Sequence, residues 1–192
     1  MHCIKSQYSI EETIKKSRFI GIIFPCDNEL EIQAFLRHLQ SVYPDASHIA
    51  FAYRLKTGNG FISRMNDAGE PSGTAGKPIY QHLEGKDIMN AMLAVVRYFG
   101  GIKLGAGGLT RAYGNAAKKV IETAELFPYI EWVQQELALD YKELQSFEHC
   151  LKKLDGQITN QDFGEQIQLT VRLPKENLPL LSDQYQSKYR NL

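Results

Sequence analysis

Apolar residues along the first 130 positions recur in short runs and in three- and four-residue spacings, a pattern typical of strands interleaved with amphipathic helices. Ser6 to Ile14 and Ser17 to Cys26 have the extended character of two strands. A helix follows with Asp27 or Asn28 as its N-cap, and Pro44 stops it. The apolar stripe of that helix consists of Ile32, Phe35, Leu36, Leu39 and Tyr43.

The next segments predict a hairpin followed by a long loop. His48 to Leu55 and Phe61 to Met65 flank the sequence Thr57-Gly58-Asn59-Gly60, whose turn chemistry favours a β-hairpin. Asn66 to Pro78 reads as a long loop because no apolar periodicity runs through it. A short helix is predicted to open between Pro78 and Leu83.

The segment Ile88 to Phe99 is a continuous apolar run that fits either a buried strand or a buried helix. The β-branched pair Val95-Val96 favours the strand. An amphipathic helix follows and ends before Pro128, which closes a first domain at residues 1–130. The apolar face of that helix consists of Leu109, Ala112, Tyr113, Ala116, Val120, Ile121 and Ala124.

Residues 131–192 carry a separate pattern and are predicted to form a second, smaller domain. Val133 to Tyr141 reads as a strand, and Leu144 to Leu154 reads as a helix that ends at the turn Asp155-Gly156. Ile167 to Leu173 alternates strictly between apolar and polar residues, which indicates a strand with one buried face. Leu178 to Tyr189 is predicted to be the final helix.

Charge is balanced overall, with 22 Lys and Arg residues against 22 Asp and Glu residues. No global field therefore attracts polyanions. The distribution is uneven, since residues 60–120 hold eight basic and four acidic residues whereas residues 131–192 hold seven basic and ten acidic ones. Residues 60–120 are therefore the segment to which an anion is expected to bind.

Cysteine usage and hydropathy point to the cytoplasm. The three cysteines, Cys3, Cys26 and Cys150, are far apart and fit neither a disulfide framework nor a zinc site. The apolar patch from Phe19 to Phe24 is shorter than a signal peptide or a membrane span requires. We therefore expect a cytoplasmic protein without a membrane partner.

Glycine, small hydroxyl and basic residues concentrate in two segments, Asp67 to Pro78 and Arg97 to Gly114, which hold nine of the fifteen glycines. Backbone N–H groups without a neighbouring Cβ can form an anion-binding nest, and a helix that begins near Gly108 adds unpaired N–H groups. The alternative is that these glycines only permit tight turns. The predicted anion- or nucleic-acid-binding residues are Gly73, Gly76, Lys77, Arg97, Gly100, Gly101, Lys103, Gly105, Gly107, Gly108 and Arg111.

Motifs for nucleotide cofactors and for catalysis are weak. Lys77 is followed by Pro78 rather than by Ser or Thr, and Gly105-Ala106-Gly107-Gly108 does not complete the GxGxxG pattern, so no cofactor is predicted. Loop carboxylates are more often solvated or capping groups than catalysts, which favours a noncatalytic protein and no metal site. The weak catalytic candidates are His48, Asp67, Glu70 and Ser72.

Four blocks of sequence resemble the bacterial, YigZ-like members of the IMPACT family. They are KKSRFIG at Lys15–Gly21, SHIAFAYR at Ser47–Arg54, DAGEPSGTAGKPI at Asp67–Ile79 and VVRYFGGIKLGAGGLTRAYG at Val95–Gly114. The order and spacing of the blocks also fit that family. The resemblance is by motif over residues 15–125 and by pattern alone over the C-terminal lobe.

The resemblance implies an α+β protein of two domains. The N-terminal domain would share its fold with domain 2 of a ribosomal small-subunit protein and with domain IV of elongation factor G. The C-terminal lobe would be ferredoxin-like, as in domain V of elongation factor G, and such a fold ends with one more edge strand. For function, fold analogy suggests binding to nucleic acid or to the ribosome and a link to the regulation of translation.

Three functions remain open from the sequence. The favoured one is a noncatalytic protein that binds RNA or a ribosomal surface through the cations of the glycine-rich segments. The second is an enzyme that acts on a small molecule bearing phosphate or carboxylate, with His48, Asp67, Glu70 and Ser72 near the same loops. The third is a protein-interaction module of a translation stress response that uses the acidic C-terminal lobe.

Overall fold

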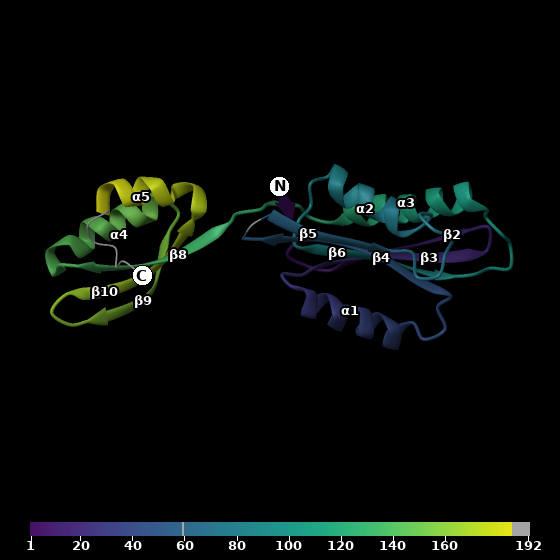
Figure 1. The fold of residues 1–192 in the computed structure, drawn as a ribbon, viewed down its shortest axis with the longest axis horizontal. Helices are drawn as coiled ribbons and strands as arrows, with labels where there is room; N and C mark the ends of the chain where they lie inside the picture. Colours follow the sequence, from purple (N-terminus) through teal and green to yellow (C-terminus); the bar gives the residue numbers. More distant parts are fainter. Residues whose placement is uncertain (59, 186–192) are drawn as a thin grey trace. The chain divides into compact units, whose positions relative to one another are not determined.

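A five-stranded antiparallel sheet with the order β2-β3-β6-β4-β5 forms the centre of the first of two units, Met1–Tyr129 and Ile130–Leu192 (Figure 1). The structure is a computed structural model and describes residues 1–58 and 60–185. The strands of this sheet are β2 (Tyr8–Ile14), β3 (Ser17–Pro25), β4 (His48–Thr57), β5 (Gly60–Asn66) and β6 (Ala91–Tyr98). A separate short pair joins β1 (His2–Cys3) to β7 (Phe127–Pro128).

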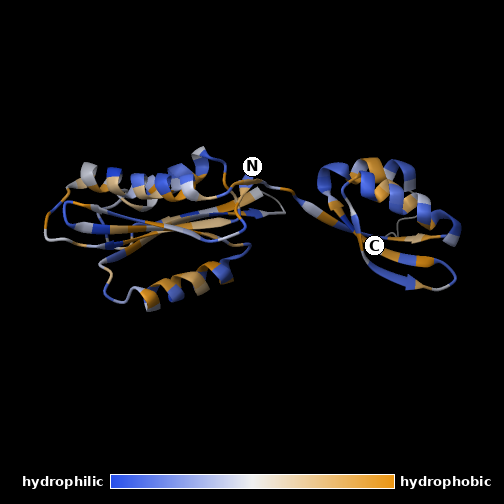
Figure 2. Cartoon of the chain, turned by 180° about the vertical axis from the view of Figure 1, so that it is seen from behind, coloured by the Kyte–Doolittle hydropathy of each residue, from blue (hydrophilic) through white to orange (hydrophobic). Residues whose placement is uncertain are grey.

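Helices cover both faces of the sheet. Helix α1 (Glu29–Val42) lies on one face, and α2 (Gly76–Gly85) and α3 (Ala106–Thr123) lie on the other (Figure 1). Figure 2 shows the hydrophobic central strands between helices of mixed polarity. Strand β6 is buried on both sides, which explains why its sequence is a continuous apolar run without alternation. The strand prediction for this run is therefore confirmed.

The remaining elements of the first unit also follow the sequence. The hairpin forms as predicted. Strands β4 and β5 pair antiparallel, from Phe51 opposite Asn66 to Thr57 opposite Gly60. Asn28 is the N-cap of α1, because its side chain accepts a hydrogen bond from the N–H of Glu31 at 2.9 Å. Helix α2 begins at Gly76, two residues before the predicted opening at Pro78.

The second unit contains five main helices and strands, four of which the sequence analysis predicts, and the strand at Gln157–Phe163 is additional. They are β8 (Trp132–Leu139), α4 (Leu144–Lys153), β9 (Gln157–Phe163), β10 (Ile167–Pro174) and α5 (Leu178–Tyr185). The antiparallel sheet has the order β8-β10-β9, as in the first three strands of a ferredoxin-like fold. The predicted last turn of the final helix, to Tyr189, and the edge strand expected after that helix lie outside the described residues.

Across the part of the chain that the structure describes, none of the helices has both the length and the apolar character needed to span a membrane.

Gly100 lets the segment after β6 pack against the turn between β2 and β3. A Cβ at this position would lie 2.0 Å from the backbone carbon of Lys16, far inside van der Waals contact. We expect Gly100→Ala to lower the free energy of unfolding by about 3 kcal/mol, because backbone cannot move aside as a flexible side chain can. Gly85→Ala at the end of α2, where a Cβ meets nothing within 4 Å, is the matched control and should be nearly neutral in urea unfolding.

Candidate functional site

The two glycine-rich segments meet at one cavity of about 530 Å³ in the first unit. Ser47 and His48 line it at the start of β4, and Glu70 and Pro71 line it from the loop after β5. The second segment supplies Arg97, Phe99, Lys103 to Ala106, and Leu109. A volume of this size is in the range of small-molecule sites and can hold about one nucleotide.

A buried cluster of three polar side chains forms the floor of this cavity. Nη1 of Arg97 on β6 donates to Oε1 of Glu70 at 2.6 Å, and the hydroxyl of Tyr113 on α3 donates to the same oxygen at 2.7 Å. Only 6% of the Arg97 side chain and 3% of the Glu70 side chain are exposed. Burial and the bond to Glu70 raise the pKa of Tyr113, so its hydroxyl stays protonated and remains a donor.

This pairing corrects the prediction that Arg97 is a free cation for a phosphate. The charge of its guanidinium is balanced by Glu70, because the two side chains form a short ion pair away from water. Its Nη2 also lies 3.5 Å from the hydroxyl of Ser17. Nε of Arg97 is buried and has no hydrogen-bond partner among the described residues. Arg97 is therefore a paired, buried cation rather than a free charge at the surface.

Ser17 is a site residue that the sequence reasoning did not single out. Its side chain is fully buried and accepts the N–H of Gly100 at 3.1 Å. The Gly100 N–H is therefore satisfied within the protein and is not available to a ligand, contrary to its predicted role. Ser17 lies within the KKSRFIG block that resembles the IMPACT family, but the sequence of a strand does not show which distant group its serine bonds to.

In the first glycine-rich segment, the backbone N–H groups that were expected to bind an anion bind a carboxylate of the same segment. The carboxylate of Asp67 accepts the N–H groups of Gly73, Ala75 and Gly76 at 2.8, 2.9 and 2.8 Å. Gly73 and Gly76 are thus not free to bind an outside anion, which corrects the prediction for both. Burial alone would raise the pKa of Asp67, but the three N–H donors outweigh burial and hold the pKa below its usual range. Asp67 therefore stabilises the start of α2.

Of the four catalytic candidates, the structure brings His48 and Glu70 together. Nδ1 of His48 lies 2.8 Å from the carbonyl oxygen of Ala68, which can only accept, so Nδ1 carries a proton. Nε2 of the same ring lies 3.9 Å from Oε1 of Glu70 at the cavity. Ser72 is exposed and does not line the cavity.

The second glycine-rich segment ends at an uncapped helix terminus. Gly105, with φ of +71°, is the N-cap of α3 and has no side chain that could accept the first N–H groups of this helix. Gly101 is also left-handed, at φ +84°, a conformation that glycine adopts without strain. Gly105 and Ala106 line the cavity, so the positive end of α3 opens into it. Gly107 and Gly108 belong to the first turn of α3.

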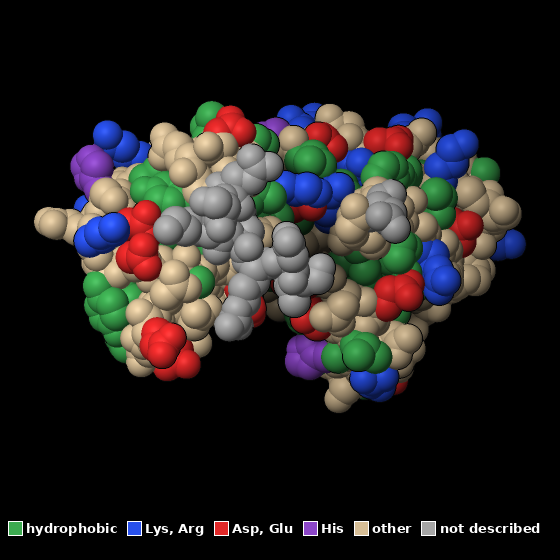
Figure 3. Space-filling model, turned by 60° about the vertical axis from the view of Figure 1, so that its left-hand side comes forward, with side chains coloured by type: hydrophobic (Ala, Val, Ile, Leu, Met, Phe, Trp, Pro, Cys, Tyr) green, Lys and Arg blue, Asp and Glu red, His purple; other side chains and the backbone are tan. Residues whose placement is uncertain are grey.

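Two exposed cations flank this helix terminus. Lys103 lines the cavity, and Nη1 of Arg111 lies 3.7 Å from the point where a Cβ on Gly107 would be. Lys77 is exposed in the first turn of α2 but is not among the residues that line the cavity. On the face of the described residues shown in Figure 3, basic and acidic side chains are interspersed. That face therefore carries no broad basic patch among its described residues.

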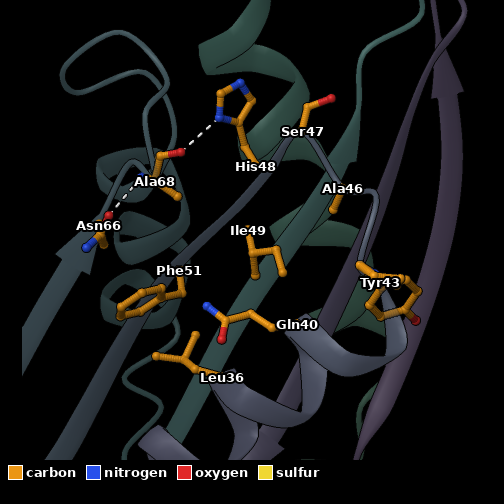
Figure 4. A pocket seen from close by; sticks show the side chains of 11 residues that line it. Leu36, Gln40, Tyr43, Ala46, Ser47, His48, Ile49, Phe51, Asn66 and Ala68 are labelled. Atoms are coloured by element: carbon orange, nitrogen blue, oxygen red, sulfur yellow. Dashed lines mark hydrogen bonds between the residues drawn. The ribbon is translucent and has the colours of Figure 1, made fainter.

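A second cavity of about 420 Å³ lies beside the first (Figure 4). It is lined by the C-terminal half of α1 and by the first residues of β4, and it shares Ser47 and His48 with the first cavity. Its polar side chains include the amides of Gln40 and Asn66. Within the described ranges, no group of three or more His, Cys, Asp or Glu side chains is placed to hold a metal ion.

The fold and the cavity define a two-domain α+β protein in which the N-terminus of a helix opens into a partly polar site. Residues 15–121 match the Impact N-terminal domain, and residues 137–184 match a domain of unknown function, DUF1949. The chain belongs to the IMPACT family, as its sequence motifs indicated.

Relatives are similar over most of the chain. An IMPACT family member of Haemophilus influenzae is 33% identical over 185 residues, which are 96% of this chain and 90% of that protein. The IMPACT family member YigZ of Escherichia coli is 37% identical over 86% of this chain and 82% of its own length. A crystal structure of a hypothetical protein, 32% identical, superposes with a TM-score of 0.70 over 95% of this chain and 89% of that chain.

The capping role of Asp67 predicts a pH-dependent contribution to stability. Asp67→Asn should lower the free energy of unfolding by about 1–2 kcal/mol at pH 7, because the three N–H donors lose a charged acceptor. The folded pKa of Asp67 lies below the unfolded value of about 3.9, so this contribution is complete above about pH 5 and is lost as the pH falls through the folded pKa.

Urea unfolding of wild type and Asp67→Asn at pH 7 and at pH 3 measures this effect. The difference between the two proteins should shrink at pH 3. Asp45→Asn, at an exposed position, is the control and should change little at either pH. An Asp67→Asn protein as stable as wild type at pH 7 would contradict the capping role.

Proposed function

We propose that this chain is a noncatalytic cytoplasmic protein that binds RNA, free or in the ribosome, and acts in the regulation of translation. The observation that supports this most is the uncapped N-terminus of α3, which opens into the 530 Å³ cavity beside Lys103. The link to translation rests on the fold that membership of the IMPACT family implies, which would be shared with domains of translation factors and ribosomal proteins.

The N-terminus of α3 has the properties of a phosphate site. The N-cap glycine of this 18-residue helix makes no side-chain hydrogen bond to its first N–H groups, and the aligned peptide dipoles place about half a positive charge there. Lys103 and Arg111 add two exposed cations beside it.

An exposed aromatic ring at the same cavity fits a nucleic acid better than inorganic phosphate. Phe99 is 49% exposed and lines the cavity next to the cations. Bases of a single strand stack on such a ring with about 1–3 kcal/mol per base. Tyr113 cannot act in this way, because it is fully buried and bonded to Glu70.

Salt dependence tests the proposed phosphate contacts. Binding of a labelled single-stranded RNA should weaken with salt at a log–log slope of about −0.7 per cation–phosphate contact, hence about −1.4 for Lys103 and Arg111. Lys103→Ala and Arg111→Ala should each reduce the slope by about 0.7, as measured by fluorescence anisotropy. Lys153→Ala, an exposed cation of the second unit, is the control and should leave the slope unchanged.

Wild-type affinity in the Lys103→Ala, Arg111→Ala double variant would place the RNA elsewhere on the protein. A pull-down from lysate with and without nuclease separates RNA from a protein partner. A partner retained after nuclease treatment would favour the protein-interaction function through the C-terminal lobe.

An enzyme that acts on a phosphate-bearing small molecule is the second candidate function. The observation in its favour is His48, whose Nδ1 is held by Ala68 while Nε2 faces Glu70 in the cavity that we assign to phosphate. A panel of phosphate esters should show turnover that is lost in His48→Ala if this candidate is correct. We expect no turnover above that of the His48→Ala protein.

A further inference from the structure

Strand β5 (Gly60–Asn66) is an edge of the five-stranded sheet, and among the described strands it neighbours β4 alone. The other edge strand, β2, carries Glu11 and Glu12 in its middle, and such charges discourage the addition of a further strand. β5 contains no acidic residue, and its side chains are exposed from position 61 to position 66. Three of these exposed side chains are large and apolar: Phe61, Ile62 and Met65.

The register of the hairpin shows which backbone groups of β5 face away from β4. Lys56 lies opposite Phe61, and its N–H is bonded at 2.8 Å to the side chain of Asn90, which directly precedes β6. Lys56 and Phe61 therefore form a non-hydrogen-bonded pair, so the N–H and C=O of Phe61 point outward from the edge of the sheet. The register has no shift and the pattern alternates, so the backbone groups of Ser63 and Met65 point outward as well.

The side chains of β5 define the pattern that an added strand would meet. Phe61 and Met65 lie on the face that α2 and α3 cover, since Met65 is opposite the core residue Ala52. Ile62 and Arg64 lie on the opposite face, because successive side chains of a strand alternate. A strand with apolar residues at alternate positions and an acidic residue opposite Arg64 complements this pattern.

Charge favours an acidic partner over a second copy of this chain. The hairpin, residues 48–66, contains Arg54, Lys56 and Arg64 and no Asp or Glu. Arg54 is buried and lies 3.5 Å from Asp87, whereas Arg64 is exposed. Pairing of β5 with β5 of a second copy would bring two basic hairpins together, which charge repulsion opposes. A segment that carries Asp or Glu is attracted to the same edge.

We propose that β5 is a docking edge at which an extended acidic segment of a partner protein, with apolar residues at alternate positions, adds as a further strand. Backbone hydrogen bonds to Phe61, Ser63 and Met65 supply affinity, and the side chains on the two faces supply specificity. These residues do not line the cavity at the N-terminus of α3, so the proposal goes beyond RNA binding and does not depend on it.

Binding of two labelled peptides to the full chain, followed by fluorescence anisotropy, tests this proposal. The acidic probe is acetyl-EVEIEVE-amide, and the basic probe is acetyl-KVKIKVK-amide, which has the same apolar positions. The acidic probe should bind roughly 10-fold more tightly than the basic one. Equal affinity for the two probes overturns the proposal, and so does the absence of binding of the acidic probe up to about 1 mM.

Ser63→Pro tests whether the backbone edge binds the probe. It removes an N–H that points away from β4, and proline is tolerated on an edge strand in this position. Affinity for the acidic probe should fall at least about 10-fold, the loss expected when strand addition is blocked. Ser63→Ala keeps the N–H and is the control, which should bind like wild type. Equal affinity of the two variants overturns the proposal.

Arg64→Glu tests the charge preference by a change of an exposed side chain that leaves the backbone intact. The preference for the acidic probe should fall to within about 2-fold. Lys153→Glu, the same charge reversal in the second unit, is the control and should keep the preference. A preference that survives in Arg64→Glu overturns the assignment of the acidic segment to this edge.

Two further measurements separate this proposal from its alternatives. Sedimentation velocity that shows a wild-type dimer, abolished in Ser63→Pro, would assign the edge to a second copy of the chain and overturn the acidic partner. Salt-dependent RNA binding should be the same in Ser63→Pro as in wild type, because β5 is not part of the proposed phosphate site. Failure of peptide binding therefore leaves the RNA-binding proposal standing, and failure of RNA binding leaves the docking edge standing.

Discussion

The ion pair between Arg97 and Glu70 holds together the three elements that build the site. Arg97 lies on β6, Glu70 on the loop after β5, and Tyr113, which bonds to the same carboxylate oxygen, on α3. Removing one member of such a buried pair leaves an uncompensated charge and costs about 3–5 kcal/mol, whereas the intact pair contributes little net stability. The contribution of this pair is therefore positional, because it fixes the loop against α3 and so shapes the cavity floor.

Two glycine-rich segments of similar composition have different roles because of one carboxylate. Asp67 accepts the N–H groups of Gly73, Ala75 and Gly76, so its negative charge lies at the start of α2. The start of α3 has Gly105 in the corresponding place and no carboxylate near it in sequence. One terminus is neutralised by the chain itself, and the other keeps its positive end directed at a cavity.

The sequence predicted the fold in most of its elements because each element follows from local spacing. Strand β6 was the uncertain case, and its β-branched residues indicated the strand that burial on both faces explains. The site was harder to predict, since its pairings are long-range. Glu70 and Arg97 lie 27 residues apart in the sequence, and Ser17 and Arg97 lie 80 residues apart. The amino-acid composition gives their charges and hydroxyls but does not show which side chains pair. The sequence alone therefore predicts Arg97 to be a free cation, whereas in the structure Glu70 neutralises its charge.

The weakness of the remaining charges argues for an extended ligand. With Arg97 neutralised by Glu70, the exposed cations that remain are Lys103, which lines the cavity, and Arg111, which lies near Gly107. Exposed charges are screened within about 8 Å at physiological salt. A single phosphate on a small molecule gains only these two contacts and the helix terminus. If RNA binds as we propose, a strand that crosses the same place would also stack on Phe99. Several weak contacts along one strand add up where a single phosphate does not, which is why this geometry favours RNA over a phosphate-bearing metabolite.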